Sequence, residues 1–500
     1  MKITVVLIPL IILYSTVSAF EGNVRIRLHR RFPACRGTIE NHYAGDEFGF
    51  YDRFRFRSGT MRFSLLLDKA RGEEWVDIIS GGVMWTPPNG NFQSVSAGWL
   101  KVDLGSGMVI SYPGSWSDLN ELALYKPPGI RNRIEPATSA WGCRGDPLIG
   151  AGALARFGDL DVSFLAAYSL LDSIGDGHHR TVSEIAGKAA IHETLGAIRV
   201  GGEEWGVTLA GATELDSDDR YWVRMGTDWD LDFSTFTFTG ETAAGVDSGG
   251  VSVAFWAAPS QNFGDFRHML MLLRNPSDFP DARTSAPIGR ECDIGFCYGF
   301  RWNVFSRTAL KAGAATYFND DEHLLRGSAE VQYRFPWSME ASAGVRTRTE
   351  TAESGWRAWT GNSWQPLEKL NIRTKLSVTG WTSDEDSTEN GTGIELRIRY
   401  FPVSLLSLGL GGAAFATDGY NSRIYAAEAF FPGEFGSTAL WDRGFMFHMS
   451  ISAEISEDLF LRARFLRKII ENAAVLGSGW EETEGDSRTE FGFQLDCAFQ

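Results

Sequence analysis

The segment EFGFQLDCAF, residues 490–499, alternates apolar side chains with small or polar ones. A repeat of two residues places the apolar set on one face of a β-strand and the remaining set on the other. A strand of this kind fits the wall of a membrane β-barrel, which has lipid outside and a lumen inside. We expect the apolar set to form the membrane-insertion signal: Phe491, Phe493, Leu495 and Phe499, with Cys497 on the same face.

The same alternation recurs along the chain, in short segments separated by Gly, Pro, Asn, Asp and Ser. Segments of about ten residues with turns between them are typical of transmembrane barrels. The predicted fold is therefore all-β, a large antiparallel transmembrane β-barrel of about 18–24 strands with loop or plug insertions. The clearest segments are residues 24–29, 53–57, 232–239, 309–318, 325–335, 370–381, 391–401, 445–454 and 459–467.

The chain begins with the three parts of a secretory signal peptide, which we assign to residues 1–19. Lys2 is followed by an apolar run over residues 5–14 and by the small residues Val17, Ser18 and Ala19. Residues 20–500 then form one barrel domain in the bacterial outer membrane. Its expected partners are the outer-membrane lipid and the barrel-assembly machinery.

Several segments interrupt the alternation. Residues 116–147 are rich in Pro, Gly and Arg and are expected to form a plug or a long loop. Residues 180–193 have the composition of a short helix. Residues 263–289 and 350–368 look like loops at their centres.

The composition supports a β-protein and excludes some functions. Aromatic residues make up 13% of the chain, with 17 Trp and 55 Gly, which suits aromatic girdles and tight turns. A soluble secreted β-protein such as a propeller has a similar composition and stays an alternative. The net charge of −16 argues against direct binding of nucleic acid.

Arginines that repeat at period two are the candidates for lining the lumen, because a charge facing lipid near the midplane costs about 2–4 kcal/mol. Two interpretations are open: a wall that favours anions, or a lattice of ion pairs with carboxylates that fills the lumen. The candidates are Arg25, Arg27, Arg53, Arg55, Arg57, Arg397, Arg399, Arg462 and Arg464.

Signals for catalysis, cofactors and metals are weak. The chain has no G-x-S-x-G elbow, so we predict neither an enzyme nor a cofactor. His178, His179, His192 and Glu193 match no metal-ligand spacing, and no metal site is predicted. Among the five cysteines, Cys292 and Cys297 are spaced for a small disulfide loop.

Five segments, in order along the chain, resemble bacterial outer-membrane proteins of the helix-hairpin-helix domain-containing family. They read YDRFRFRSGTMRFSLLLDKARGEE (51–74), WLKVDLGSGM (99–108), HRTVSEIAGKAAIHETLG (179–196), NSRIYAAEAFFPGEFG (421–436) and a last segment over 476–499 that opens on LGSGWEE. The resemblance implies the barrel fold and the outer-membrane location. The DNA-binding helix-hairpin-helix modules of that family have no counterpart in this sequence.

Two functions from different classes follow from these patterns. The first is a pore or transporter whose Arg-lined lumen admits anionic solutes, small or polymeric, of unknown identity. The second is a surface structural or binding barrel, plugged and without transport activity.

Overall fold

The structure is a computed structural model, and it describes residues 21–111, 121–125, 127, 129–138, 147–173, 178–216, 220–279, 292–319, 322–383, 387–428, 431–434 and 437–499. The predicted signal peptide and part of the predicted plug at residues 116–147 lie outside these ranges.

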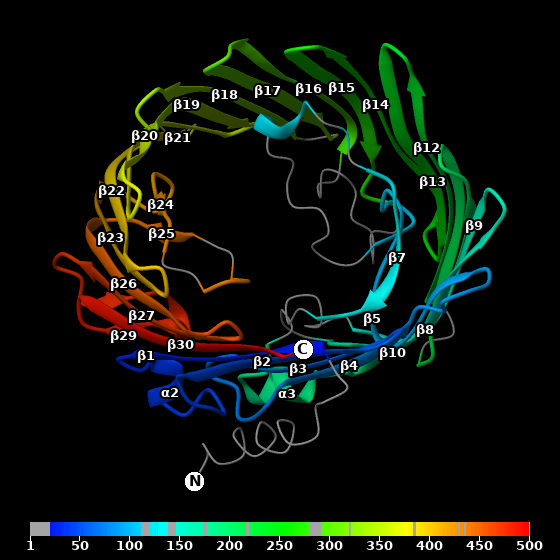
Figure 1. Ribbon diagram of the computed structural model, residues 1–500, viewed down its shortest axis with the longest axis horizontal. Coiled ribbons are helices and arrows are strands. Elements are labelled where there is room, and N and C mark those ends of the chain that lie inside the picture. Colours follow the sequence, from blue (N-terminus) through cyan, green and yellow to red (C-terminus); the bar gives the residue numbers. More distant parts are fainter. Residues whose placement is uncertain are drawn as a thin grey trace.

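Twenty-four antiparallel strands form a closed ring, which is the wall of the barrel (Figure 1). Sequential strands pair with each other, except that β5 pairs with β8, β23 with β26, and β27 with β30. The predicted all-β barrel fold is confirmed. The wall strands are β1 (Glu21–Phe32), β2 (Phe48–Ser58), β3 (Met61–Lys69), β4 (Ile78–Trp85), β5 (Phe92–Gly105), β8 (Leu148–Phe157), β9 (Leu160–Leu171), β10 (Ile191–Gly201), β11 (Trp205–Glu214), β12 (Tyr221–Phe233), β13 (Phe236–Asp247), β14 (Gly250–Phe263), β15 (Phe266–Asn275), β16 (Cys292–Phe305), β17 (Thr308–Phe318), β18 (His323–Phe335), β19 (Met339–Glu350), β20 (Glu353–Leu367), β21 (Leu370–Ser383), β22 (Thr388–Val403), β23 (Leu406–Thr417), β26 (Arg443–Ser456), β27 (Leu459–Ile470) and β30 (Ser487–Phe499).

The first and last strands close the ring. β1 pairs with β30 from Gly22 opposite Phe499 to Phe32 opposite Thr489. The alternation in β30 directs Phe491 and Phe493 outward, where they are 49% and 39% exposed. Gln494 on the inner face is buried.

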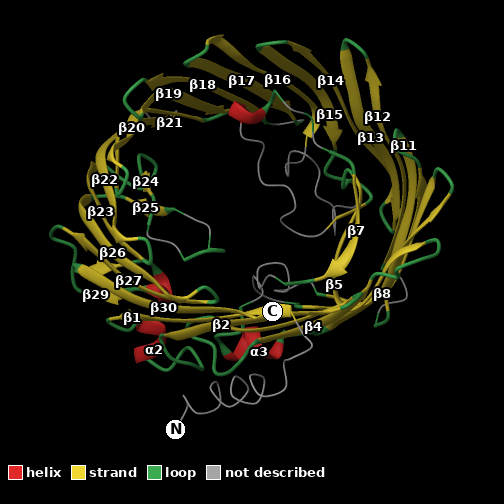
Figure 2. Ribbon diagram, viewed as in Figure 1, coloured by secondary structure: helices red, strands yellow, loops and turns green. Residues whose placement is uncertain are grey.

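Helices are short and few in the described part of the chain (Figure 2). They are α2 (Arg36–Ile39), α3 (Val182–Ala186), η1 (Glu121–Ala123) and η3 (Gly479–Glu481). Among the described residues, no helix is long and apolar enough to cross a bilayer. The helix expected over residues 180–193 is limited to α3, because Gly187 caps it and β10 begins at Ile191.

The two rims of the barrel differ in the length of their connections. One rim, the turn rim, has tight turns such as residues 158–159, 234–235 and 306–307. The opposite rim, the loop rim, has all the long connections, including residues 33–47, 172–190, 418–442 and 471–486.

An inner sheet lies inside the ring because β5 leaves the wall after Trp99 (Figure 1). Residues 100–105 of β5 pair with β7 (Arg131–Pro136) and β6 (Ile110–Ser111) instead of with the wall. Gly98 sits at the departure point with a φ of +106°, and a Cβ there would lie 2.3 Å from the Gly81 carbonyl oxygen. A side chain at this position would therefore block the bend.

The inner sheet packs against the wall through a hydrophobic core. Val102, Leu104 and Ile134 of the inner sheet are buried, and the core also contains the inward side chains Trp256 and Met269 of the wall. This core explains why the inner faces of β14 and β15 are apolar rather than polar.

A second insertion, the inner hairpin, consists of β24 (Ile424–Ala426) and β25 (Thr438–Leu440) within the connection from β23 to β26. It also lies inside the ring, next to β22 and β23 (Figure 1). Ala426 and Leu440 pack with Phe415 of β23 and Met446 of β26. Both insertions thus enter the lumen from the loop rim.

Candidate functional site

Part of the predicted arginine set forms ion pairs across the strands where the barrel closes. Arg25 Nε donates to Asp496 Oδ1 at 2.5 Å, and Arg462 bonds the other oxygen of the same carboxylate. One carboxylate on β30 therefore joins guanidinium groups from β1 and β27. These two arginines are held by a structural partner.

The tip of the inner hairpin holds two more predicted arginines. Glu434 lies 2.5 Å from Arg464 and 3.3 Å from Arg27. The carbonyl oxygen of Pro432 accepts hydrogen bonds from Arg25 and Arg27. The hairpin tip is thereby tied to β1 and β27 by charge.

The other predicted arginines have fewer acidic partners. On β2, Arg55 bonds the Thr138 hydroxyl and Arg57 donates to the Gly59 carbonyl oxygen at 3.2 Å. Arg53 precedes them on the same face of the strand. On β22, Arg397 lies 2.7 Å from Glu395, while Arg399 is exposed.

A larger basic surface covers the inner face of seven neighbouring strands, β16 to β22, and we call it the basic wall. These strands contain eleven Lys and Arg against seven Asp and Glu, although the whole chain has a charge of −16. All eighteen alternate with the exposed apolar residues of their strands, so they share the lumen face. The cations are Arg301, Lys311, Arg326, Arg334, Arg346, Arg348, Arg357, Arg373, Lys375, Arg397 and Arg399.

Several cations of the basic wall are open to the lumen. Arg346, Arg373 and Arg399 are exposed, and no ion pair is found for Arg373 or Arg399 within the described ranges. Other cations pack against aromatic rings: Arg357 lies 4.7 Å from the ring centre of Tyr425 in the inner hairpin. Contact with a ring leaves the positive charge without a counter-charge.

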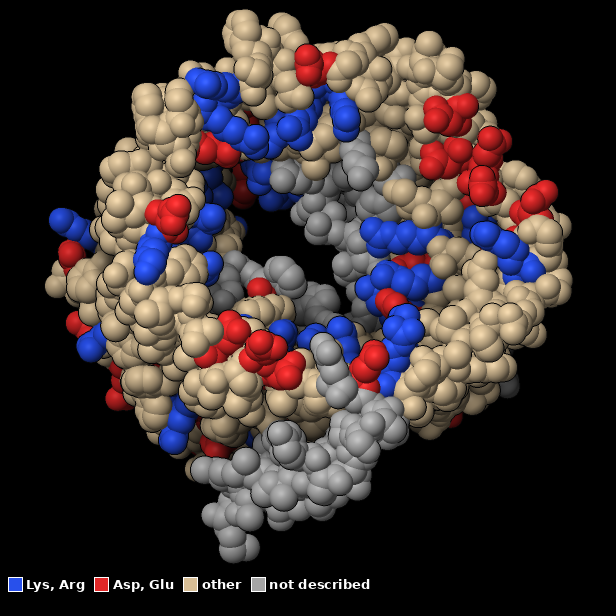
Figure 3. All heavy atoms as spheres, in the orientation of Figure 1, with Lys and Arg blue, Asp and Glu red and all other residues tan. Residues whose placement is uncertain are grey.

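An opening is visible through the middle of the molecule, with Lys and Arg around part of its border (Figure 3). The inner sheet adds Lys101, Arg131 and Arg133 across the lumen from the basic wall. Arg133 bonds Asp103 and lies 3.2 Å from Glu135, so the inner sheet is closer to neutral than the basic wall.

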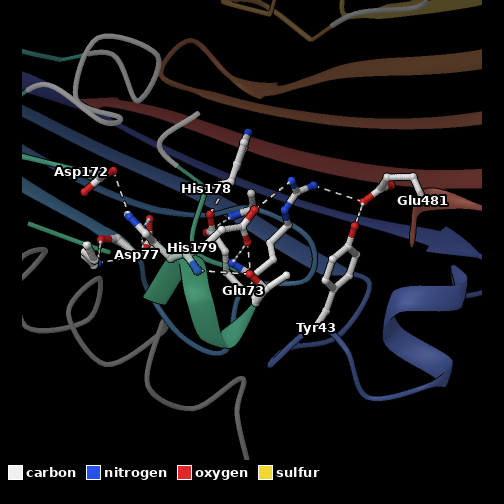
Figure 4. Close-up of polar contacts among 12 residues, drawn as sticks. Tyr43, Glu73, Asp77, Asp172, His178, His179 and Glu481 are labelled. Carbon is white, nitrogen blue, oxygen red and sulfur yellow. Dashed lines mark hydrogen bonds and ion pairs between the residues drawn. The ribbon is translucent and has the colours of Figure 1, made fainter. Parts of the chain in front are cut away.

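At the loop rim, His179 joins two connections that are distant in the sequence (Figure 4). Its Nδ1 lies 2.8 Å from Asp77, just before β4, and its Nε2 lies 3.0 Å from Asp172, just after β9. Lys188 also bonds Asp77, at 2.8 Å. Since both ring nitrogens of His179 are engaged and the ring is buried, we interpret this cluster as a clamp rather than a reactive site.

A neighbouring cluster fastens the connection between β1 and β2 to the rim. Glu47 accepts hydrogen bonds from Cys35 N and Arg31 Nε, both at 2.9 Å. Burial alone would raise the pKa of Glu47, but these hydrogen bonds outweigh burial and lower its pKa to about 2. Glu481 of η3 accepts a hydrogen bond from Arg31. It also accepts one from the Tyr43 hydroxyl, and this contact is seen at the right of Figure 4.

The residues weighed as a metal site do not converge. His178 contacts Glu73, whereas His192 lies 3.7 Å from Asp216 and Glu193 accepts from Trp222 Nε1. No group of three His, Cys, Asp or Glu suited to a metal ion occurs within the described part of the chain.

The prediction of a disulfide between Cys292 and Cys297 is wrong. Both residues belong to β16 and are not joined to each other. Five residues of extended strand separate their Cα atoms by roughly 16 Å, far beyond the reach of a disulfide. Cys297 Sγ instead lies 3.7 Å from the Tyr317 hydroxyl.

Sequence reasoning missed most of the basic wall, although a usable signal was present. Arg346 and Arg348 repeat at period two in RTRT, and Arg373 and Lys375 do so in RTK. Residues 370–381 were recognised as a strand, but Arg373 and Lys375 were not assigned to the lumen. Both pairs alternate with Thr rather than with large apolar residues, so the lumen face was less distinct.

Comparisons with known proteins found likeness among solved structures only. No protein-family model matches the chain, and no curated protein matches it. Among solved structures, a mutant of the ferric enterobactin receptor PfeA from Pseudomonas aeruginosa has a TM-score of 0.46 at 10% identity, over 96% of this chain and 80% of that one. The translocation pore of the P pilus usher PapC gives 0.42 at 11% identity, over 96% and 99%. An anion-selective porin from Comamonas acidovorans gives 0.34 at 13% identity, over 61% and 99%. The strand pairing itself shows that the chain is a closed antiparallel β-barrel.

Proposed function

We propose that this barrel is an outer-membrane channel that favours anionic solutes, and the basic wall carries the proposal. An excess of cations on one lumen face raises the local concentration of anions and lowers the barrier to their passage. Exposed side chains such as Arg373 and Arg399 are available to a passing solute. The predicted arginines on β1 and β27 contribute less, because each of them is paired with Asp496 or Glu434.

The rims suggest the orientation. Outer-membrane barrels have short turns on the periplasmic side and longer loops outside. The turn rim would then face the periplasm, and the His179 clamp would lie at the cell surface. Membrane lipid and the assembly machinery are partners in this proposal, and the relation to helix-hairpin-helix domain-containing proteins is proposed from the matching segments alone.

The second candidate is a plugged surface barrel, and the two insertions favour it. The inner sheet and the inner hairpin are both anchored, one by a buried core and the other by Glu434. We assign no reaction to either candidate. Ser106, in the turn between β5 and β6, bonds Glu241 and Trp256, and among the described residues it has no hydrogen bond with a histidine.

Ion selectivity of the refolded mature protein in a planar bilayer decides between the candidates. Under a KCl gradient, the reversal potential of an anion-selective channel has the same sign as the equilibrium potential of chloride. We expect the double variant Arg346→Glu, Arg373→Glu to lower the chloride-to-potassium permeability ratio several-fold. Arg443→Glu is the matched control, because Arg443 is 75% exposed at the loop rim, beside Glu471.

Each result has a definite meaning. A chloride-selective current that the double variant weakens and Arg443→Glu leaves unchanged supports the channel. A folded but silent barrel supports the plugged surface protein. If the double variant has the same chloride-to-potassium permeability ratio as the parent protein, the basic wall is not the selective surface.

A further inference from the structure

A buried carboxylate anchors the inner sheet to the wall. Glu241, on the inner face of β13, is fully buried. Its Oε2 accepts a hydrogen bond from the Ser106 hydroxyl at 2.5 Å and another from Met108 N at 3.0 Å. Trp256 Nε1 donates to the same Ser106 oxygen at 3.2 Å. The turn between β5 and β6 is thus held on the wall by one glutamate.

A second buried carboxylate lies directly opposite Glu241. Asp228 on β12 is the register partner of Glu241 and is 2% exposed. Its Oδ1 accepts from Arg199 Nη2 at 2.8 Å. Two acids directly opposite each other on neighbouring strands repel when both are ionised.

The two remaining carboxylate oxygens face the same small space beside Gly105. A Cβ on Gly105 would lie 3.0 Å from Asp228 Oδ2 and 3.2 Å from Glu241 Oε1. Neither of these buried oxygens has a hydrogen-bond partner among the described residues. Asp228 Oδ2 and Glu241 Oε1 therefore point to the same place, and no hydrogen-bond donor from the described residues reaches either oxygen.

The charges around this spot do not balance. Asp228 and Glu241 would contribute two negative charges, and Arg199 on β10 contributes one positive charge. The next charged groups lie further along β12: Asp230 accepts from Thr239, and Arg224 donates to the Val109 carbonyl oxygen and stacks on Trp222. On β14, Trp256 is neutral. A buried excess charge is strongly destabilising, so one more positive charge is required.

We propose that Asp228 and Glu241 hold one shared proton, and that this proton locks the inner sheet onto the barrel wall. With the proton present, the pair and Arg199 are neutral together, and Glu241 still accepts from Ser106 and Met108. Without it, the repulsion between the two carboxylates is relieved when the turn at residues 105–109 leaves the wall and water enters. The lock is therefore closed at low pH and weakens as pH rises.

The sign and the slope follow from proton linkage. The closed lock holds one proton more than the open one, in which both carboxyl groups are solvated and ionised above about pH 5. Opening then releases one proton. The equilibrium constant for opening rises about tenfold per pH unit, until the closed pair itself ionises.

Hydrogen–deuterium exchange of residues 100–111, followed by mass spectrometry on the full barrel in detergent, measures this opening. Exchange rates are corrected at each pH for the intrinsic rate of an unstructured peptide. We expect the protection of these amides to fall about tenfold per pH unit between pH 6 and 8. A slope of zero would overturn the shared proton.

Two substitutions mimic the protonated pair and sharpen the test. In Glu241→Gln, the side-chain oxygen still accepts from Ser106 and Met108, while the amide donates to Asp228 Oδ2. Asp228→Asn provides the reverse pairing. Both variants should keep full protection at every pH, whereas Glu241→Ala should lose it at every pH.

Glu395→Gln is the matched control, since Glu395 is another buried inward glutamate on the far side of the lumen. It should leave the pH slope of residues 100–111 unchanged. If Glu241→Gln loses protection as Glu241→Ala does, the wall requires the ionised carboxylate and the proposal is wrong. The exchange experiment does not measure ion current, so its result tests the shared proton independently of the proposed channel function.

Discussion

Arginine side chains that repeat at period two have two different environments in this barrel. Arg25 and Arg462 share the carboxylate of Asp496, while Arg373 on the basic wall is exposed. The difference depends on which strands are neighbours and on where the inner hairpin reaches. A sequence pattern places an arginine on the lumen face and leaves its partner undetermined.

The position of the Arg199 guanidinium requires a glycine at residue 206. It lies across Gly206, where a Cβ would be 1.5 Å from Arg199 Nη1. We predict that Gly206→Ala displaces the guanidinium from Asp228 and leaves a buried charge unpaired. Breaking a buried pair costs about 3–5 kcal/mol, so the free energy of unfolding should fall by roughly that amount. Urea unfolding in detergent micelles measures the change.

Gly196→Ala on the adjacent strand is the control for this substitution. The nearest atom to a Cβ at Gly196 is 3.9 Å away, an ordinary contact. Equal stability of the two variants would show that Arg199 accommodates the methyl group without losing its partner.

At the scale of elements, the connection between β1 and β2 is held by the ionised form of Glu47. The pKa of Glu47 is about 2 in the folded protein, against an ordinary value of 4.5. Its contribution to stability is therefore present above pH 4.5 and disappears as pH falls toward 2. We predict that Glu47→Gln lowers the free energy of unfolding by about 3 kcal/mol at pH 7.

Unfolding of Glu47→Gln and the parent protein, measured from pH 7 down to pH 2, tests this prediction. The difference between them should shrink below pH 4.5. Glu40→Gln is the control, because Glu40 is 47% exposed and pairs with the exposed Arg36. A difference that does not change with pH would mean that the charge of Glu47 is not what holds the connection.

Strands with one face toward lipid and one toward a polar lumen were predictable. Residues 309–318 and 459–467 fall within β17 and β27. β15 was not predicted, and residues 263–289 looked like a loop, because Met269 and Met271 pack in the inner core and make both faces apolar. Likewise, β20 occupies most of residues 350–368, where a loop was expected.

The turn at residues 234–235 was also missed. Residues 232–239 were predicted to form one strand, yet they contain the end of β12, the turn and the start of β13. The alternation changes phase at the turn, because two polar residues, Ser234 and Thr235, separate Phe233 from Phe236. This two-residue change is the only mark of the turn in the sequence, since the turn contains neither Gly nor Pro.

The lock on the inner sheet could not be found from the sequence. Ser106 and Glu241 are 135 residues apart, and no local pattern connects them. The inner sheet itself was anticipated only as a plug or loop over residues 116–147, since the bend at Gly98 depends on the Gly81 backbone of a neighbouring strand.

At the scale of the whole molecule, the predicted insertion signal coincides with the strand that closes the ring. The Phe499 ring lies 5.6 Å from the Phe56 ring on the outer face. We predict that Phe499→Ser lowers the amount of heat-modifiable barrel in the membrane fraction, because an apolar contact at the closing strand is lost. Semi-native gel electrophoresis of membranes measures this form.

Phe305→Ser is the control for assembly, since Phe305 is 71% exposed at the end of β16, far from the closing strands. If both variants assemble like the parent protein, recognition does not depend on Phe499.

The pairing of β1 with β30 also determines when the barrel can be completed. Gly22 lies opposite Phe499, so the ring cannot close before the last strand of the chain has been synthesised. Throughout that delay the growing sheet has two free edges, each able to pair with another chain. Contacts of such long sequence separation form slowly. The closing step is therefore the step at which an unfinished chain is most exposed to pairing with its neighbours.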